Sequence, residues 1–328
     1  DEARTMVGLF IEYGPTVQVR DQRQDEIMIY RDTDIMTAYD GPLAVLVNRG
    51  SASASEIFAG AIQDYGRGVV LGSQTFGKGS VQQLLALNHG QLKVTQAMFY
   101  RINGESVQHR GVIPDIVYPS RYNLELVGEN TLEDSLPYAE IPSTIYRPHG
   151  KIVELIPELT TRHNKRVSVD PEYQYVADAV AYRHELSNRE AISLNKETRL
   201  SEKEDNNQFW LSLENRKRVA QGLPEIDSLD ELSSSSDSSD DTQTEVVTGE
   251  QDTAAAILAN ATPDSDGEEA VDTETTEVAT VDESITEEET PPPDVYIRAA
   301  GNVLLDILSL STRTAERVDN ERRWGSAQ

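Results

Sequence analysis

Two spacings of hydrophobic residues dominate residues 1–120. Residues 2–11 repeat apolar positions at helical spacing, whereas residues 42–47 form an unbroken apolar run that suits a strand buried on both faces. Further short apolar or alternating stretches, bounded by glycine and polar turns, also predict strands. These stretches are 16–20, 26–31, 69–71, 81–87 and 93–100. The pattern therefore predicts a mixed α/β region.

A βαβ unit is predicted within residues 42–71. The tight loop Asn48-Arg49-Gly50 follows the buried strand, and a helix begins near Ser53. The apolar residues of this helix share one face: Ile57, Phe58, Ala61, Ile62 and Tyr65. Glycines end the helix before the strand at 69–71. Strand, helix and strand in this order favour a mixed sheet built from βαβ units.

The pattern changes after residue 120. Residues 121–225 predict a small helical domain, with helical periodicity strongest at 171–186 and 201–220. Residues 226–293 are mostly Ser, Thr, Asp and Glu, so they bury too little apolar surface to offset the entropy of ordering, and we predict a disordered acidic linker. Helical periodicity returns in residues 294–318, which predicts a terminal helix that docks on the folded body.

The charge of the chain is concentrated in that linker. The 328 residues carry a formal net charge of −28, and 23 of the 57 acidic residues lie between Glu225 and Asp294, which leaves 34 acids against 29 Lys plus Arg elsewhere. Such a chain repels phosphate backbones, which argues against a nucleic-acid partner. The absence of cysteine excludes thiol nucleophiles and Cys-ligated metal sites. No apolar stretch is long enough to predict a transmembrane segment.

Ser53 is the first candidate for chemistry, because it lies between two alanines at a strand–loop–helix junction. Small neighbours let a carbonyl group approach, and backbone N–H groups at a helix N-terminus point toward an oxyanion. The same residues also fit a capping box, Ser53-Ala-Ser-Glu56, in which the serine only caps the helix. Residue types alone favour the cap, and both interpretations stay open.

Lys78 is the second candidate, because it is one of only two lysines in the first 150 residues. A lysine can lose its proton when desolvated, whereas an arginine cannot, and a lysine base beside a serine is a known arrangement for acyl transfer. Gly77 and Gly79 allow the backbone to turn and aim the side chain inward. A surface lysine in a loop is the plain alternative.

Residues 72–79 also resemble a phosphate-binding P-loop, G-x-x-x-x-G-K-[ST]. The last position is Gly79, which has no hydroxyl for Mg²⁺, and a strand rather than a helix is predicted to follow. None of the five histidines has metal-ligand spacing. His89 and His109 lie in the core half and could act as a general base, although turn or surface positions are the simpler interpretation.

Two blocks carry a family resemblance. Residues 48–67, Asn-Arg-Gly-Ser-Ala-Ser-Ala-Ser-Glu-Ile-Phe-Ala-Gly-Ala-Ile-Gln-Asp-Tyr-Gly-Arg, and residues 75–83, Thr-Phe-Gly-Lys-Gly-Ser-Val-Gln-Gln, closely resemble the tail-specific proteases, or C-terminal processing peptidases. Residues 99–104 and 111–116 match as well. The helical part resembles the long Gram-negative branch more loosely, through residues 163–164 and 193–195.

The resemblance implies roles for particular residues of this chain. Ser53 resembles the nucleophile, Lys78 its general base, and Gln82 the third member that orients the lysine. The backbone N–H of Ala54 resembles one oxyanion donor. The family uses no metal or organic cofactor, so none is expected here.

The resemblance also implies a wider context. It implies a ClpP/crotonase-like α/β core, of which residues 1–120 would be the C-terminal part. It also implies a periplasmic serine endopeptidase that acts on extended polypeptides with apolar C-termini. An envelope adaptor protein is an expected partner. In this family a glycine pair, a PDZ domain and a signal peptide precede the region matched here. Because the chain contains none of these, we expect a C-terminal fragment that lacks one oxyanion donor, which favours inactivity in isolation.

A function of a different class remains as an alternative. The chain could be a non-catalytic scaffold that binds peptides or a partner through its helical part and acidic linker. The linker itself could be a solvated tether or an electrostatic element that acts on charged surfaces. Loss of cleavage in Ser53→Ala protein would separate the protease from the scaffold.

Overall fold

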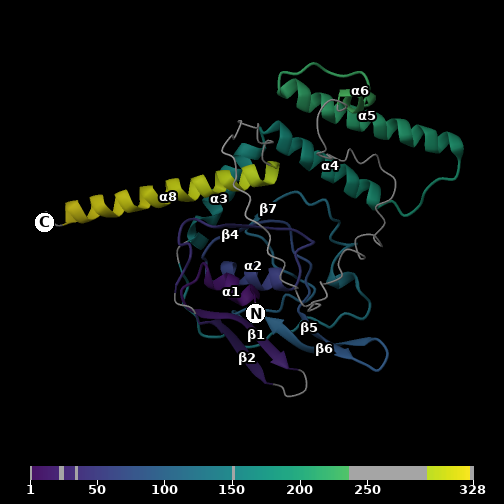
Figure 1. Ribbon diagram of the computed structural model, residues 1–328. Coiled ribbons are helices and arrows are strands. Elements are labelled where there is room, and N and C mark those ends of the chain that lie inside the picture. The colour runs from purple at the N-terminus through teal and green to yellow at the C-terminus, as the bar shows by residue number, and fades with distance from the viewer. Residues whose placement is uncertain (1, 22–25, 34–35, 150–151, 236–293, 326–328) are drawn as a thin grey trace, which may run out of the picture. The chain divides into compact units, whose positions relative to one another are not determined.

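The computed structural model describes residues 2–21, 26–33, 36–149, 152–235 and 294–325 (Figure 1). Most of the predicted acidic linker, residues 236–293, lies outside these residues. All of the helices and strands described here belong to one compact unit, which comprises residues 1–238 and 295–328.

Two sheets form the N-terminal region. The first is antiparallel, with the strand order β2-β1-β6-β5. Its strands are β1 (Gly14–Asp21), β2 (Ile27–Asp32), β5 (Ser80–Ala86) and β6 (Gln91–Tyr100). The second sheet is parallel, with the order β3-β4-β7. Its strands are β3 (Ala44–Val47), β4 (Val69–Gly72) and β7 (Ile116–Val117).

Helix α2 (Ala54–Asp64) connects the parallel strands β3 and β4, which confirms the predicted βαβ unit. The strands predicted at 16–20 and 26–31 correspond to β1 and β2, and those predicted at 81–87 and 93–100 correspond to β5 and β6; each two are paired antiparallel. The mixed α/β core is thus present as predicted. Strand β3 differs in one respect, because it is an edge strand and Leu46 is 43% exposed rather than buried.

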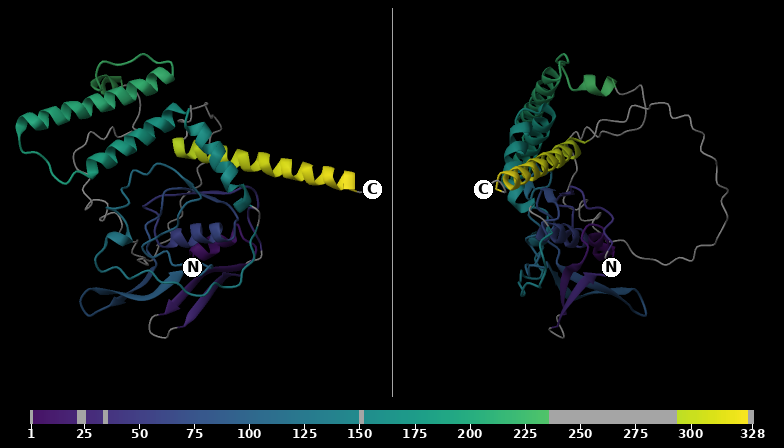
Figure 2. Two further views of the ribbon diagram at one scale, coloured as in Figure 1. Left: turned by 180° about the vertical axis from the view of Figure 1, so that it is seen from behind. Right: turned by 90° about the vertical axis from the view of Figure 1, so that its left-hand side faces the viewer.

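Helices make up the region after residue 120. They are α3 (Ile152–Val167), α4 (Pro171–Ser187), α5 (Lys196–Ala220), α6 (Asp230–Ser235) and α8 (Val295–Gly325). Figures 1 and 2 show α4 and α5 side by side, in agreement with their direct packing. Helix α6 lies within the range predicted as linker, where Asn215 fixes the chain by two hydrogen bonds of 2.9 Å with the backbone of Ile226.

The hydrophobic core joins the helices to the parallel sheet. One cluster contains Val69 and Leu71 of β4, Leu159 of α3, and Val303 and Ile307 of α8, all of them buried. In the same cluster, the ring of Tyr118 stacks on that of His163, with 4.8 Å between the ring centroids. The N-terminal helix α1 (Glu2–Gly8) packs on α2 in a separate cluster. The C-terminal helix therefore completes a core that begins in the peptidase-like region.

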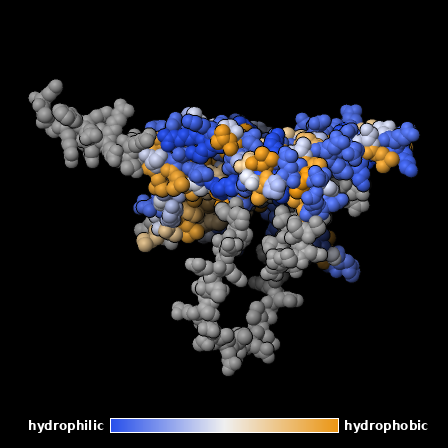
Figure 3. All heavy atoms as spheres, turned by 90° about the horizontal axis from the view of Figure 1, so that it is seen from above, coloured by the Kyte–Doolittle hydropathy of each residue, from blue (hydrophilic) through white to orange (hydrophobic). Residues whose placement is uncertain are grey.

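The surface gives no sign of a membrane-spanning element in the part of the chain that the structure describes. None of its helices combines the length and the apolarity that a crossing would need. On the face seen in Figure 3, hydrophobic residues lie in separate patches among hydrophilic ones.

Candidate active site

Ser53 lies at the sharp turn between β3 and α2 and has a strained backbone. Its φ of 54° and ψ of −107° fall in a region that residues with a side chain rarely adopt. With Glu56, Ser53 forms the capping box that the sequence indicated, in which Glu56 Oε2 accepts from Ser53 N–H. A cap alone does not explain the strain, because an N-cap residue ordinarily has extended backbone angles. A strained serine at a strand-to-helix turn is instead the geometry of an exposed nucleophile.

The carboxylate of Glu56, which is 0% exposed, binds the backbone on both sides of the candidate site. Oε2 accepts hydrogen bonds from Ser53 N–H at 2.8 Å and from Lys78 N–H at 2.9 Å. Oε1 accepts from the Thr75 hydroxyl at 2.5 Å and from Gly77 N–H at 2.6 Å. One buried side chain therefore fixes the loops of both predicted catalytic residues.

The four donors also affect whether the Glu56 carboxyl group is ionised or protonated. Burial raises the pKa of Glu56 to about 7, while the hydrogen bonds from Thr75, Gly77, Ser53 and Lys78 act in the opposite direction. All four partners donate, so the ionised carboxylate can accept every bond, whereas a protonated one must place a donor of its own against another. The hydrogen bonds therefore favour the ionised form, and burial favours the protonated form.

The loop of Lys78 is held by hydrogen bonds of its backbone. Gly77 has a φ of +91°, and a Cβ there would lie 2.9 Å from the carbonyl carbon of His109, so only glycine fits. Gly77 N–H and Lys78 N–H donate to Glu56, and Gly79 N–H donates to Gln108 Oε1 at 2.8 Å. These are the N–H groups that a P-loop would offer to phosphate, and strand β5 follows instead of a helix. The structure thus argues against nucleotide binding at this loop.

The predicted site residues are brought together only in part. Ser53 and Lys78 are both half-buried and share the Glu56 carboxylate, but among the described residues no hydrogen bond joins the serine hydroxyl to the lysine amine. Gln82 is exposed on β5, and its amide donates to Thr95 Oγ1 at 3.5 Å rather than approaching Lys78. Ala54 is the exposed first residue of α2, whose N–H has no partner within the helix.

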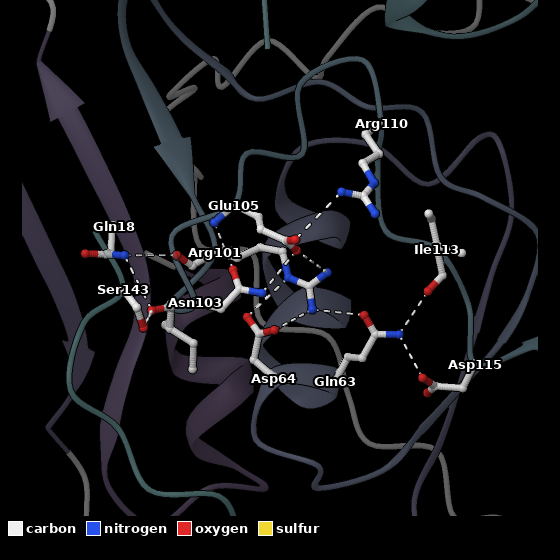
Figure 4. A network of polar contacts seen from close by, with 11 residues as sticks. Gln18, Gln63, Asp64, Arg101, Asn103, Glu105, Arg110, Ile113, Asp115 and Ser143 are labelled. Atoms are coloured by element: carbon white, nitrogen blue, oxygen red, sulfur yellow. Dashed lines mark hydrogen bonds and ion pairs between the residues drawn. The ribbon is translucent and has the colours of Figure 1, made fainter. Parts of the chain in front are cut away.

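The far end of α2 is fixed by a second polar cluster (Figure 4). Arg101 makes an ion pair with Asp64, and its guanidinium also donates to Gln63 at 2.9 Å. The Gln63 amide in turn donates to Asp115 Oδ1 at 2.9 Å. Burial raises the pKa of Asp64, and the charge of Arg101 acts against that rise. Helix α2 is therefore anchored at both ends, which fixes the direction in which Ser53 points.

The side chains of the two candidate histidines make no hydrogen bond to Ser53 or Lys78 in the described part of the chain, although the backbone N–H of His109 donates to the Gly77 carbonyl at 2.8 Å. His89 lies exposed at the turn between β5 and β6, and His109 Nε2 makes a 2.8 Å hydrogen bond with the Ser135 hydroxyl. Within the described ranges, no group of three or more His, Asp or Glu side chains is placed to hold a metal ion. The only candidate nucleophile and base that share a partner there are Ser53 and Lys78.

Comparison with known families agrees with this geometry. Residues 1–118 match peptidase family S41, and residues 122–309 match the C-terminal domain of tail specific protease. The chain belongs to the tail-specific proteases. It is 38% identical over 243 residues to the tail-specific protease of Haemophilus influenzae and 43% identical over 119 residues to a carboxy-terminal-processing protease of Bartonella bacilliformis.

The chain spans only part of these relatives. The two alignments cover 70% and 36% of this chain, but 35% of the Haemophilus protein and 27% of the Bartonella protein. Among solved structures, the photosystem II D1 C-terminal processing protease is 35% identical, with a TM-score of 0.32, and the match covers 38% of this chain and 31% of that one.

The contribution of Glu56 to this tail-specific protease site was not apparent from the sequence. Its spacing from Ser53 indicated only a local capping box, whereas three of its four partners lie 19 to 22 residues further along the chain. Thr75 is a second such residue, since its fully buried hydroxyl donates to Glu56 and accepts from Val112 N–H. Burial at these two positions restricts the charge and size of the residues that can occupy them. A single sequence does not reveal that restriction.

Proposed function

We propose that this chain carries the nucleophile and the general base of a serine endopeptidase. Ser53 Oγ attacks the scissile carbonyl carbon, and the neutral amine of Lys78 takes the serine proton. The Ala54 N–H stabilises the oxyanion, and Lys78 returns the proton to the leaving amine. Water then hydrolyses the acyl-enzyme. Gln82 acts by orienting Lys78, which requires its amide to exchange the Thr95 hydroxyl for the lysine as partner.

One observation carries the proposal: the buried Glu56 carboxylate binds the backbone N–H groups of both Ser53 and Lys78. Burying a carboxylate is costly even with the charge of Arg49 nearby, so the position of Glu56 needs a reason. Holding a strained serine and a lysine loop in fixed relation is such a reason. A scaffold that only bound a partner would have no need for the strain at Ser53.

The substrate class is the second part of the proposal. The relatives are described as tail-specific and carboxy-terminal-processing proteases, which supports polypeptides chosen by their C-termini. We propose extended chains with apolar C-terminal residues as substrates. We also propose a periplasmic location, with an envelope adaptor as a possible partner; both rest on family resemblance, and cell fractionation would test the location.

The test uses a chimera in which this chain follows the preceding part of the Haemophilus influenzae relative, because the match covers only 35% of that protein. Cleavage of an unfolded protein with an apolar C-terminus is compared with cleavage of the same protein ending in charged residues. We expect cleavage of the first only, and loss of cleavage in Ser53→Ala and Lys78→Ala. The variant Ser55→Ala, at an exposed serine of the same helix, is the matched control. Cleavage that survives Ser53→Ala would contradict the proposal.

A further inference from the structure

A segment at the start of the C-terminal domain, residues 124–136, contacts both loops of the candidate active site. Its 3₁₀ turn, Glu129–Thr131, begins with Glu129, whose N–H donates to the Phe76 carbonyl at 3.0 Å. Phe76 lies two residues before Lys78, and Phe76 N–H donates to the Ser51 carbonyl at 2.9 Å. The segment, the Lys78 loop and the Ser53 loop are thus joined through one residue.

The first long contact to this segment is made by Arg49, which lies four residues before Ser53 and is 1% exposed. Its guanidinium donates to the carbonyls of Thr75, Leu124 and Val127 and to Asn130 Oδ1. Among the described residues, no carboxylate forms an ion pair with it. The planar, multiple-donor guanidinium therefore joins its own loop to two other stretches of the chain, at Thr75 and at residues 124–130, which a lysine could not do.

The second contact is made by Gln108, which is 0% exposed. Its Oε1 accepts from Gly79 N–H at 2.8 Å, directly after Lys78. Its Nε2 donates to Glu129 Oε1 at 3.1 Å and to the Leu136 carbonyl at 2.9 Å. The amide thus connects the far side of the Lys78 loop to the same segment. Because Oε1 accepts one hydrogen bond and Nε2 donates two, a flip that exchanges these two atoms is disfavoured.

The two contacts act on opposite sides of the loop. Arg49 binds the carbonyl of Thr75 before Lys78, and Gln108 binds the N–H of Gly79 after it. The backbone of Lys78 itself is held by Glu56. A lysine that must accept a proton from Ser53 has to be placed within a fraction of an ångström, so a loose loop lowers the rate more than it lowers substrate binding.

We propose that residues 124–136 hold the Lys78 loop in its catalytic position, with Arg49 and Gln108 as positioning residues. The C-terminal domain is then part of the active-site support, not only an appended module. This inference rests on the proposed function insofar as it predicts activity. The placement of the loop can also be measured without activity, which keeps the two proposals separable.

The test changes the segment rather than Arg49 or Gln108, and hydrogen exchange in α4 reports whether the rest of the chain stays folded. Glu129→Ala removes an acceptor of Gln108, and Asn130→Ala removes an acceptor of Arg49 from an exposed residue. Glu125→Ala is the matched control, because Glu125 is exposed in the same segment and its side chain makes no contact in the described part of the chain. Hydrogen exchange of residues 75–80 is measured on the 328-residue chain, and kcat and KM on the chimera.

We expect exchange at residues 75–80 to rise about tenfold in the double variant Glu129→Ala/Asn130→Ala, with exchange in α4 unchanged. We expect kcat to fall at least about tenfold while KM stays within about twofold. Exchange equal to that of Glu125→Ala, or an equal rise throughout the chain, would overturn the inference. If the unmodified chimera cleaves nothing, the proposed function fails, and the exchange result still decides whether the segment holds the loop.

Discussion

The Glu56 carboxylate accepts the backbone N–H of Ser53 across the first turn of α2, as in a capping box. In an ordinary capping box both side chains serve the helix. Here the glutamate serves more than the helix. The same carboxylate extends to the Lys78 loop, so a local helix-capping pattern also links the two loops of the candidate site.

The first prediction concerns the charge of that link. Glu56→Gln places an amide NH₂ among four donors, so at least one donor loses its acceptor inside the protein. We expect kcat of the chimera to fall roughly 10- to 100-fold and the free energy of unfolding of the chain to fall by about 2 kcal/mol. Glu125→Gln, on an exposed residue, is the control and should leave both values unchanged.

The second prediction is a pH dependence of stability. Burial raises the pKa of Glu56 from its ordinary value of 4.5 to about 7 in the folded chain, so between these pH values the folded state holds the extra proton. Stability contributed by this group is therefore fully present below pH 4.5, falls as the pH rises, and is lost by about pH 7. The total change is about 3 kcal/mol.

Urea unfolding from pH 4.5 to 8, followed for both proteins, measures this change. The difference in unfolding free energy between the wild type and Glu56→Gln should shrink steadily as the pH rises to 7 and stay constant above it. A difference in unfolding free energy that is flat across this range, or that grows with pH, would show that the folded chain does not lose the Glu56 proton near pH 7.

The third prediction compares two glycines with positive φ. Gly77 has a φ of +91°, and an added Cβ would lie 2.9 Å from the backbone of His109; Gly90 has a φ of +80° with nothing within 4 Å. Gly90→Ala should cost about 1 kcal/mol from backbone strain alone. Gly77→Ala should cost more than about 2 kcal/mol and abolish cleavage, because the Lys78 loop must shift. Thermal unfolding and the cleavage assay measure the two effects, and equal behaviour of both variants would contradict this account.

The fourth prediction concerns the anchor at the other end of α2. The side chains of the Arg101–Asp64 pair are 12% and 4% exposed, so Arg101→Met leaves a buried carboxylate without its counter-ion. We expect a loss of roughly 3 to 5 kcal/mol in the free energy of unfolding. The pair Arg216–Asp178 provides the control, because it is largely exposed and Arg216→Met should cost less than about 1 kcal/mol. Chemical denaturation of both variants gives the comparison.

Local patterns in the sequence were enough for the parts of the fold that depend on neighbours in the chain. The apolar face around Ile62 and the glycines after it predicted α2 and the strands on either side. Helix α3 was not anticipated individually, because Pro157 lies inside it and interrupts the helical pattern. Burial against β4 and α8 stabilises that helix, and this packing depends on residues more than 80 positions away.

The residues of the candidate site also fall into two groups, those that the local sequence indicates and those that only distant contacts explain. Ser53 and Lys78 stood out because their neighbours and their rarity are visible in the sequence, and their roles remain predictions until a variant is assayed. Arg49 and Gln108 did not stand out, since a buried arginine and a buried glutamine look like surface residues until their partners are known. The partners of Arg49 lie 26 to 81 residues away, and no periodicity encodes such contacts.

The position of α8 has a consequence for biosynthesis. Val303 and Ile307 fill the cluster that contains Val69 and Leu71, so the hydrophobic surface of β4 stays open until residue 307 has left the ribosome. Domains generally fold as they emerge, but this core cannot close before α8 is made. A chain that stopped before residue 295 would expose this surface of the parallel sheet. Translation of more than 230 residues therefore separates the synthesis of β4 from the burial of its surface.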